Sequence, residues 1–337
     1  MREFKSAGLA VRGLTTKPSR WVNRGLTVVS QLIGNGPEYQ RSWINSTRNS
    51  LLIPKALGNV KTWLHMGSFT VSDGRIDGIR QAMFLDSTFH LLSLQTQTGH
   101  GAVVEKKYGD AERRAVHTMD HLFTTGEFVK RDLVEHYQVD PERVTIVGTG
   151  RGRIEPSDAP KDYAERIILF VAKERFLDKG GQVLLDGFRA AVARDPRLRL
   201  IAVVEECYRQ AVESVPGATF KTAISWEELE SLFNRASLFA MPAAYEPWGL
   251  VYIEALACRT PILGLNRNAF PELTANGKFG FLLQDSTPEA VAQALADAFS
   301  DLDRLAIMGA SGQAYVMEKF SWKVAAERIL SVLFDQM

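Results

Sequence analysis

The sequence predicts an α/β protein of two doubly wound domains, and three observations lead to that prediction. The 337 residues suit about two domains of ordinary size. Short apolar segments alternate with helical segments through the second half, as they do when helices connect the strands of a parallel sheet. The same alternation returns in the later part of the first half. We therefore expect domains over residues 1–152 and 153–320, followed by a helix over residues 321–337.

The strands of the second half are predicted by short apolar segments rich in branched residues, as in buried parallel strands. We expect them at residues 166–172, 198–204, 237–243 and 260–265. The first intervening helix ends before Pro196, and a capping box of Ser225 and Glu228 opens the next.

Two further helices follow in the second half. One is expected over residues 249–258, and another opens with Thr287 as N-cap and Pro288 at the first helical position. The final segment, which begins at Ser321, carries an apolar stripe that must pack on another surface.

The first half of the sequence predicts secondary structure clearly only in its later part. It predicts strands at residues 81–86, 121–125 and 144–147 and a helix over residues 127–137. Residues 1–75 stay open, because GLTVVSQLIGNG fits either a strand with a glycine turn or an apolar helix.

Composition excludes several classes of protein. Apolar residues make up 45% and charged residues 23% of the chain, which suits a folded rather than a disordered protein. No apolar run approaches the ~20 residues of a membrane-spanning helix, and the first residues lack the apolar core of a secretory signal. Cys207 and Cys258 alone cannot build a disulfide framework or a cysteine metal site. We therefore expect a cytoplasmic protein.

The net charge of +1 is the sum of unequal parts. Residues 1–65 hold ten lysines and arginines against two glutamates, a charge of +8, which leaves −7 for the rest of the chain. A basic segment of this kind can face an anionic membrane, a nucleic acid or a phosphorylated substrate. It can equally be an ordinary solvated surface.

Glu246 and Glu254 stand eight residues apart in AAYEPWGLVYIEALACRTPILGL. If both were helical, they would lie ~12 Å apart along the axis and on about the same side. That separation exceeds the ~5 Å of a retaining hydrolase pair, but carboxylates suit the hydroxyl groups of one long sugar-bearing ligand. The plain alternative is a helix-start carboxylate and an unrelated surface carboxylate.

Lys173 and Lys179 lie in FVAKERFLDKGG, between a strand and the helix that follows it. Lys179 directly precedes Gly180 at the start of that helix. A helix N-terminus attracts anions, and open α/β sheets bind ligands at the carboxyl ends of their strands. The lysines therefore predict a metal-free diphosphate site, unless they are merely solvated.

The chain resembles family 4 of the retaining glycosyltransferases in four segments: ILFVAKERFLDKGGQVLLDGF, ISWEELESLFNRASLFAMPAAYEPWGLVYIEALACRTPILG, NAFPELTANGKFGFLL and HLFTTGEFVKRDLVEHYQVDPERVTIVGTG. The second segment carries the family's E-x7-E signature, and the resemblance spans residues 80–337. It implies the GT-B fold, in which two Rossmann-like domains face each other and a C-terminal helix crosses back to the first.

The resemblance implies a role for each matching residue. Glu246 would contact the donor sugar and Glu254 the ribose, while Lys173 and Lys179 would neutralise the diphosphate and help the leaving group depart. The remaining nucleotide contacts would come from Gly180, Gly249, Leu250, Val251, Thr222 and Ile224.

The sequence departs from the family pattern at several positions. Lys173 stands where arginine is common, which keeps the charge but loses the bidentate geometry. The turn after residue 204, which usually carries glycine, reads Glu205-Glu206.

In the first domain, Asp86 takes the place of a histidine near the reacting sugar, with His90 as second choice; alternatively, Asp86 is a helix N-cap. For the glycine-rich loop after the first strand, Gly34 and Gly36 are the candidates. Acceptor recognition is expected in this domain.

Metal and nucleic acid are not expected as partners. His117 and His121 stand four residues apart but have no third ligand for zinc. Trp21, Tyr39 and Trp43 lie among basic residues, but no nucleic-acid-binding module accompanies them.

We therefore expect a metal-independent retaining hexosyltransferase that needs no cofactor and takes a UDP-, GDP- or ADP-sugar as donor. Its acceptor would be a hydroxyl group of a glycan or lipid-linked sugar, in polysaccharide or glycolipid biosynthesis. The basic segment would hold it at the inner face of an anionic membrane. Two alternatives stay open: an epimerase or phosphorylase of the same fold, and a degenerate protein that binds sugar nucleotides without turnover.

Overall fold

The computed structural model describes residues 2–6, 10, 49, 52–53, 59–68, 74–95 and 102–334. The chain divides into two compact units: unit 1 is Met1–Thr149 with Trp322–Met337, and unit 2 is Gly150–Ser321. Gly34, Gly36 and most of the basic segment lie outside the described residues. No helix in the described ranges is long and apolar enough to cross a membrane.

Unit 1 contains a parallel sheet in the order β1-β2-β3-β4. The strands are β1 (Thr62–Met66), β2 (Arg80–Leu85), β3 (His121–Thr124) and β4 (Val144–Ile146). The helices described in this unit are α1 (Arg2–Ser6), α4 (Phe89–Gln95), α5 (Ala102–Thr118), α6 (Glu127–Glu135), the 3-10 helix η3 (Pro141–Arg143) and α14 (Trp322–Phe334). The strands and the helix predicted after residue 80 all form, whereas β1 lies in the segment that the sequence left open.

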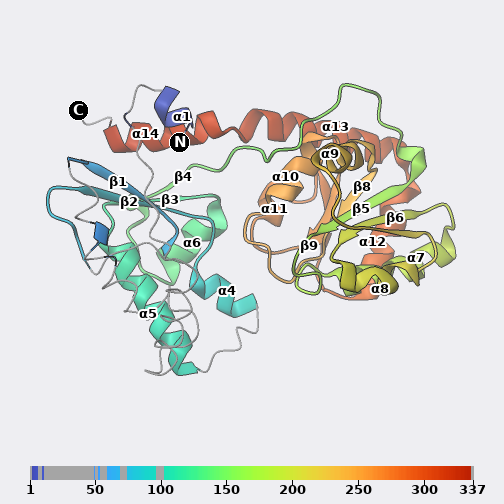
Figure 1. Ribbon diagram of the computed structural model, residues 1–337, viewed down its shortest axis with the longest axis horizontal. Helices are drawn as coiled ribbons and strands as arrows, with labels where there is room; N and C mark the ends of the chain where they lie inside the picture. Colours follow the sequence, from blue (N-terminus) through green and yellow to red (C-terminus); the bar gives the residue numbers. More distant parts are fainter. Residues whose placement is uncertain are drawn as a thin grey trace. The chain divides into compact units, whose positions relative to one another are not determined.

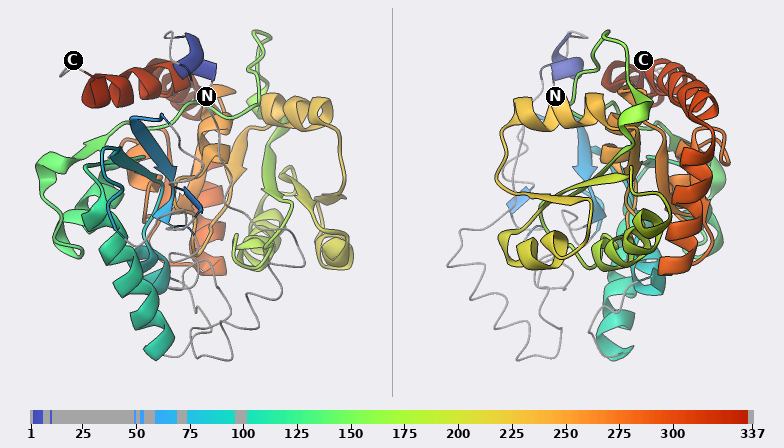
Figure 2. Two further views of the ribbon diagram at one scale, coloured as in Figure 1. Left: turned by 60° about the vertical axis from the view of Figure 1, so that its left-hand side comes forward. Right: turned by 90° about the vertical axis from the view of Figure 1, so that its right-hand side faces the viewer.

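Successive residues of β2 face opposite sides of the unit 1 sheet, since side chains alternate along a strand. Met83 packs in one apolar cluster with Val116 of α5. Its neighbour Ala82 packs in another with Ile329 and Leu333 of α14. Figures 1 and 2 show α5 and α14 on opposite sides of this sheet. The apolar stripe of the C-terminal helix is therefore buried on unit 1.

Unit 2 contains a six-stranded parallel sheet in the order β10-β9-β8-β5-β6-β7. Figure 1 labels β9, β8, β5 and β6 of this sheet. The strands are β5 (Ile167–Ala172), β6 (Arg199–Val204), β7 (Ala218–Lys221), β8 (Leu238–Ala240), β9 (Ile262–Leu265) and β10 (Gly280–Leu283). The helices are α7 (Gly181–Arg194), α8 (Arg209–Glu213), α9 (Trp226–Arg235), α10 (Leu250–Ala257), α11 (Phe270–Leu273), α12 (Pro288–Ser300) and α13 (Leu302–Lys319), with 3-10 helices η4 (Tyr163–Glu165) and η5 (Glu206–Tyr208).

The strand order of unit 2 reverses between β5 and β8. From β5 the chain continues to β6 and β7 on one side, and it then returns through β8 to β9 and β10 on the other. The carboxyl ends of β5, at Ala172, and of β8, at Ala240, therefore border a topological switch point. Open α/β sheets bind their ligands at such a point.

The predicted N-caps of unit 2, Ser225 and Thr287, are confirmed, whereas the Glu228 carboxylate of the predicted capping box pairs with Lys221. The Ser225 hydroxyl accepts from the Glu228 backbone N–H at 3.1 Å, and the Thr287 hydroxyl accepts from the Ala290 N–H at 3.2 Å. Pro288 occupies the first position of α12, where the missing N–H costs nothing. These contacts satisfy backbone donors that a helix start would otherwise leave open.

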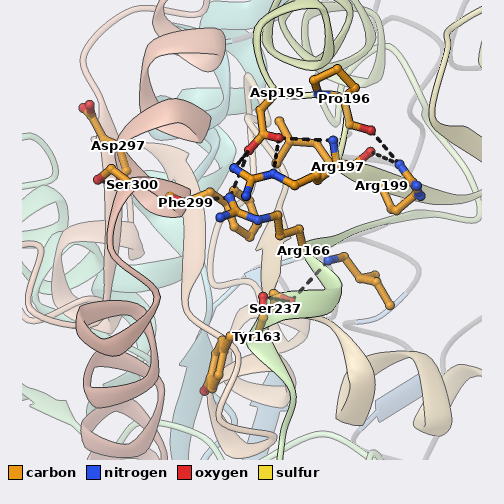
Figure 3. A network of polar contacts seen from close by, with 12 residues as sticks. Tyr163, Arg166, Asp195, Pro196, Arg197, Arg199, Ser237, Asp297, Phe299 and Ser300 are labelled. Atoms are coloured by element: carbon orange, nitrogen blue, oxygen red, sulfur yellow. Dashed lines mark hydrogen bonds and ion pairs between the residues drawn. The ribbon is translucent and has the colours of Figure 1, made fainter.

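A polar network closes the opposite, amino edge of the unit 2 sheet (Figure 3). Arg166, directly before β5, donates to Asp195 at 3.0 Å and to the Phe299 carbonyl at 3.0 Å. Arg197 donates to both oxygens of Asp195, at 2.8 and 3.0 Å. These charge-assisted hydrogen bonds hold the end of α7 and the end of α12 beside the start of β5.

Candidate functional site

The two loops at the switch point of unit 2 pack backbone against backbone. The Ala244 N–H, after β8, donates to the Asp178 carbonyl, after β5, at 2.9 Å. A Cβ at Gly180 would lie 2.2 Å from the Pro242 carbonyl oxygen, and Gly180 has a φ of +77°. Only glycine meets both conditions without strain. This contact holds the loop of Lys179 against the loop of Glu246.

Lys179 and Glu246 form an ion pair across these loops. Both side chains are mostly buried, with exposed fractions of 21% and 17%. Burial, with the neighbouring charge of Arg175, lowers the pKa of Lys179 to about 8. Two residues that the sequence predicts at one site therefore touch each other.

Two helices begin beside this ion pair, and both begin after a glycine. Gly180 is the N-cap of α7 and Gly249 is the N-cap of α10, each with a φ of 77°. Neither cap offers a side-chain acceptor, so no cap side chain satisfies the first N–H groups, those of Leu250 and Val251 included. Uncapped N–H groups and positive helix ends attract anions. The site therefore combines an ammonium group with two such helix ends.

Glu254 lies within α10, whereas Glu246 lies in the loop before it. The helical spacing considered for this pair is therefore wrong, because α10 begins only after the glycine turn. Glu254 Oε1 accepts from the N–H groups of Arg153 at 2.6 Å and Ile154 at 3.4 Å. Burial raises the pKa of Glu254, although these hydrogen bonds and Lys173 oppose the rise. The carboxylate thus fixes the segment that enters unit 2.

Lys173 is exposed directly after β5, and its Nζ lies 4.9 Å from the ring centroid of Trp226. The Arg153 guanidinium lies 4.7 Å from the centroid of the same ring. Neither Arg153 nor Trp226 is among the residues that the sequence predicted for the site. An exposed tryptophan at the first position of a helix was the available signal; Arg153, on a segment remote in sequence, gave none.

Thr222 and Ile224 follow β7, at the same carboxyl edge as the other predicted residues of unit 2. Ala223 between them has a φ of 47°, which turns the chain toward the start of α9. Their predicted contact with a nucleobase remains a prediction.

Asp86 belongs to unit 1, where it is exposed directly after β2. It is not the cap of α4: the Thr88 hydroxyl accepts from the Leu91 N–H at 3.2 Å. His90 Nδ1 lies 2.5 Å from the buried Asp132 carboxylate, and its ring stacks on His136 at 3.5 Å between centroids. Burial and the neighbouring His90 lower the pKa of His136.

The two histidines weighed as zinc ligands have other partners. His117 Nε2 lies 2.9 Å from the Tyr137 carbonyl, and His121 Nε2 lies 2.8 Å from the Thr145 hydroxyl. Burial, with the nearby charges of Arg80 and Arg143, lowers the pKa of His121 to about 4. Within the ranges described, no three side chains of the metal-ligating types form a group that could hold an ion.

Known proteins resemble this chain in sequence. Residues 154–315 match the family model of glycosyl transferases group 1. The D-inositol 3-phosphate glycosyltransferase of Streptomyces scabiei is 30% identical over 245 residues, which cover 64% of this chain and 54% of that protein. The chain spans about half the length of the first curated relatives that it matches.

Solved structures resemble it in fold. Sucrose-phosphate synthase from Thermosynechococcus elongatus has a TM-score of 0.68 at 17% identity and covers 88% of this chain and 79% of its own. HepE of Anabaena, in complex with UDP and glucose, has a TM-score of 0.59 at 14% identity. The match covers 76% of this chain and 71% of the HepE chain.

These comparisons confirm the predicted fold class, the GT-B architecture of two parallel-sheet α/β domains, and the resemblance read from the sequence. The family match falls on unit 2, which contains Lys173, Lys179, Glu246 and Glu254. Unit 2 is therefore the part of this chain that is similar to the glycosyl transferases group 1.

Proposed function

We propose that the protein is a retaining glycosyltransferase that moves a hexose from a nucleotide-diphosphate sugar to an acceptor hydroxyl. The observation that carries this proposal is the meeting of Lys179 and Glu246 with the N-termini of α7 and α10 at the switch point. Cationic and hydroxyl-binding groups thus lie side by side, as a sugar diphosphate requires. The family of unit 2 and the UDP and glucose bound to HepE support the same conclusion.

In the proposed mechanism, the diphosphate lies on the N–H groups of the two helices and between the ammonium groups of Lys179 and Lys173. These groups stabilise the negative charge that grows on the diphosphate as the bond to the sugar breaks, and they do so without a metal ion. The arrangement is preorganised, because the loops are held by backbone contacts.

Glu246 accepts hydrogen bonds from the donor sugar, and Glu254 contacts the ribose through the carboxylate oxygen not engaged by Arg153. The leaving phosphate oxygen takes the proton from the acceptor hydroxyl. Attack then comes from the face that the diphosphate leaves, so the anomeric configuration is retained.

We place acceptor binding in unit 1, with Asp86 near the reacting sugar. The acceptor is a glycan or lipid-linked hydroxyl, and the protein acts in the cytoplasm, at the inner face of an anionic membrane. The basic residues 1–65 would attract that membrane. Binding to anionic vesicles should weaken with added salt, because the attraction is screened; salt-insensitive binding would refute this part of the proposal.

Transfer assays with UDP-, GDP- and ADP-hexoses and a panel of acceptors test the proposal. We expect a product with the donor's anomeric configuration by NMR, formed also in the presence of a chelator. Lys179→Ala and Glu246→Ala should lower the rate more than about tenfold, since each removes a group acting on the transition state. The exposed Lys319→Ala is the matched control and should retain full activity.

Other outcomes would contradict the proposal. Full activity of Lys179→Ala or Glu246→Ala would show that these residues do not act as assigned. Epimerised donor in assays without acceptor would identify an epimerase, and a phosphorolysis product would identify a phosphorylase. Binding of sugar nucleotides with neither transfer nor hydrolysis across the panel would identify a binding protein.

A further inference from the structure

Glu205 lies at the carboxyl edge of the unit 2 sheet, beside the proposed donor site. It directly follows β6, whose last residue Val204 pairs in register with Ala172 of β5. Lys173 follows Ala172, so Lys173 and Glu205 leave adjacent strands at the same level. Adjacent strands lie ~4.8 Å apart. Glu205 is therefore a neighbour of a residue assigned to the diphosphate.

One oxygen of the Glu205 carboxylate, Oε2, is buried and has no hydrogen-bond partner in the described part of the chain. Glu205 stands at the N-cap of η5, yet its side chain does not cap that helix. A buried carboxylate oxygen without a donor is costly, and such groups are rare in native structures. Because the Glu205 side chain as a whole is half-buried, a change of its rotamer can bring this oxygen to a donor on a bound molecule.

The nearest cations on these segments have other partners. The Lys173 ammonium lies over the Trp226 ring. Arg209, four residues after Glu205, pairs with Glu206 at 2.6 Å and with Glu213 at 3.2 Å. Among the residues that the structure describes, Glu205 thus forms no ion pair that stabilises the fold.

The order of the strands indicates which part of the donor passes Glu205. Along the sheet edge, the loops after β8, β5, β6 and β7 carry Glu246, Lys173, Glu205 and the segment from Thr222 to Ile224. These are the assigned positions for sugar, diphosphate and base, with Glu205 between the last two. A nucleotide sugar extended along this edge places the edge of its base near Glu205.

We propose that Glu205 accepts hydrogen bonds from guanine and makes the protein prefer guanosine-diphosphate donors. Guanine presents two adjacent donors, the ring N1–H and the 2-amino group, to a carboxylate. Uracil presents one N–H between two carbonyl oxygens, which a carboxylate repels. Adenine presents an amino group next to a ring nitrogen that accepts. The inference rests on the proposed function, because it assigns the base of the same donor.

Titration calorimetry with GDP, UDP and ADP tests this assignment. GDP should bind at least about tenfold more tightly than UDP, since a bidentate pair with a base edge contributes ~1–3 kcal/mol of discrimination, or about 5- to 150-fold. Glu205→Gln should weaken GDP binding by about tenfold and change UDP binding less than about twofold. The control, Glu206→Gln, alters a carboxylate that is 63% exposed and should leave the three affinities unchanged.

A thermal melt distinguishes this binding role from a structural one. If Glu205 stabilised the fold, Glu205→Gln would lower the Tm. Glu205→Gln should raise the Tm of the protein without nucleotide, because a neutral amide costs less than a carboxylate to hold with one buried atom that has no hydrogen-bond partner. Tighter binding of UDP than of GDP, or equal weakening of all three by Glu205→Gln, would overturn the inference and leave the proposed function standing. Failure of the wild-type protein to bind any of them would overturn the proposed function itself.

Discussion

Lys179 and Glu246 form an ion pair across the switch point of unit 2, although they come from loops that follow different strands. In the proposed reaction, one binds the diphosphate and the other the sugar of the same donor. A diphosphate must therefore compete with the Glu246 carboxylate for the Lys179 ammonium.

This competition predicts opposite effects of Glu246→Gln on two ligands. A nucleoside diphosphate without sugar should bind about tenfold more tightly, because a hydrogen bond between charged groups, here mostly buried, contributes ~1.5 kcal/mol. Hexose transfer should fall more than about tenfold, because the sugar loses a charged acceptor. Calorimetry and initial rates measure the two effects. Glu318→Gln, at an exposed position of α13, is the control and should change neither the affinity nor the transfer rate. If Glu246→Gln lowered both the affinity and the transfer rate, the competition would be contradicted.

The lowered pKa of Lys179, about 8, predicts how nucleotide affinity depends on pH. A bound diphosphate favours the charged ammonium, so the pKa is higher in the complex than in the free protein. Below about pH 8 the lysine is charged in both states; above it, binding must take up a proton and the affinity falls by up to about tenfold per pH unit. Affinities measured from about pH 6.5 to 9.5 test this. Lys179→Arg keeps its charge throughout, so an equal decline in that variant would assign the titration to another group.

Gly180→Ala should be strongly destabilising. The added Cβ would meet the Pro242 carbonyl at 2.2 Å, and the φ of +77° disfavours any side chain. We expect unfolding free energy to fall by about 2–5 kcal/mol, as strain and overpacking combine, and nucleotide binding to weaken. Gly109→Ala is the matched control, because α5 has open space at Gly109. This substitution should raise the unfolding free energy by about 0.5–1 kcal/mol. Chemical denaturation measures both, and a neutral Gly180→Ala would show that the two loops are not held as described.

Asp132 supports the turn that follows β2 in unit 1. It is buried and accepts from the Thr88 hydroxyl and from His90 at 2.5 Å. Asp132→Ala leaves these donors without an acceptor and should cost about 2–4 kcal/mol of unfolding free energy. The exposed Asp110→Ala, on α5, should change stability by less than about 0.5 kcal/mol. Equal denaturation midpoints for the two variants would contradict this role.

The sequence by itself determined the local elements and the family resemblance. Branched apolar segments, capping residues at Ser225 and Thr287, and a glycine before each site helix are local signals, because they depend on backbone conformation within a few residues. The candidate residues of unit 2 could be named for the same reason, since they lie at strand ends and helix starts.

Only the tertiary structure decided which of these residues meet. The position of Glu205 beside Lys173 depends on the pairing of β6 with β5. The ion pair of Lys179 with Glu246, and the hydrogen bond from Arg153 to Glu254, depend on β8 returning to pair with β5. That pairing joins residues about seventy positions apart, and no local pattern encodes the angle at which two loops then pack. A contact between distant segments is set by the packing of the whole sheet. The sequence therefore predicted which residues belong to the site, and the tertiary structure decided which of them are in contact.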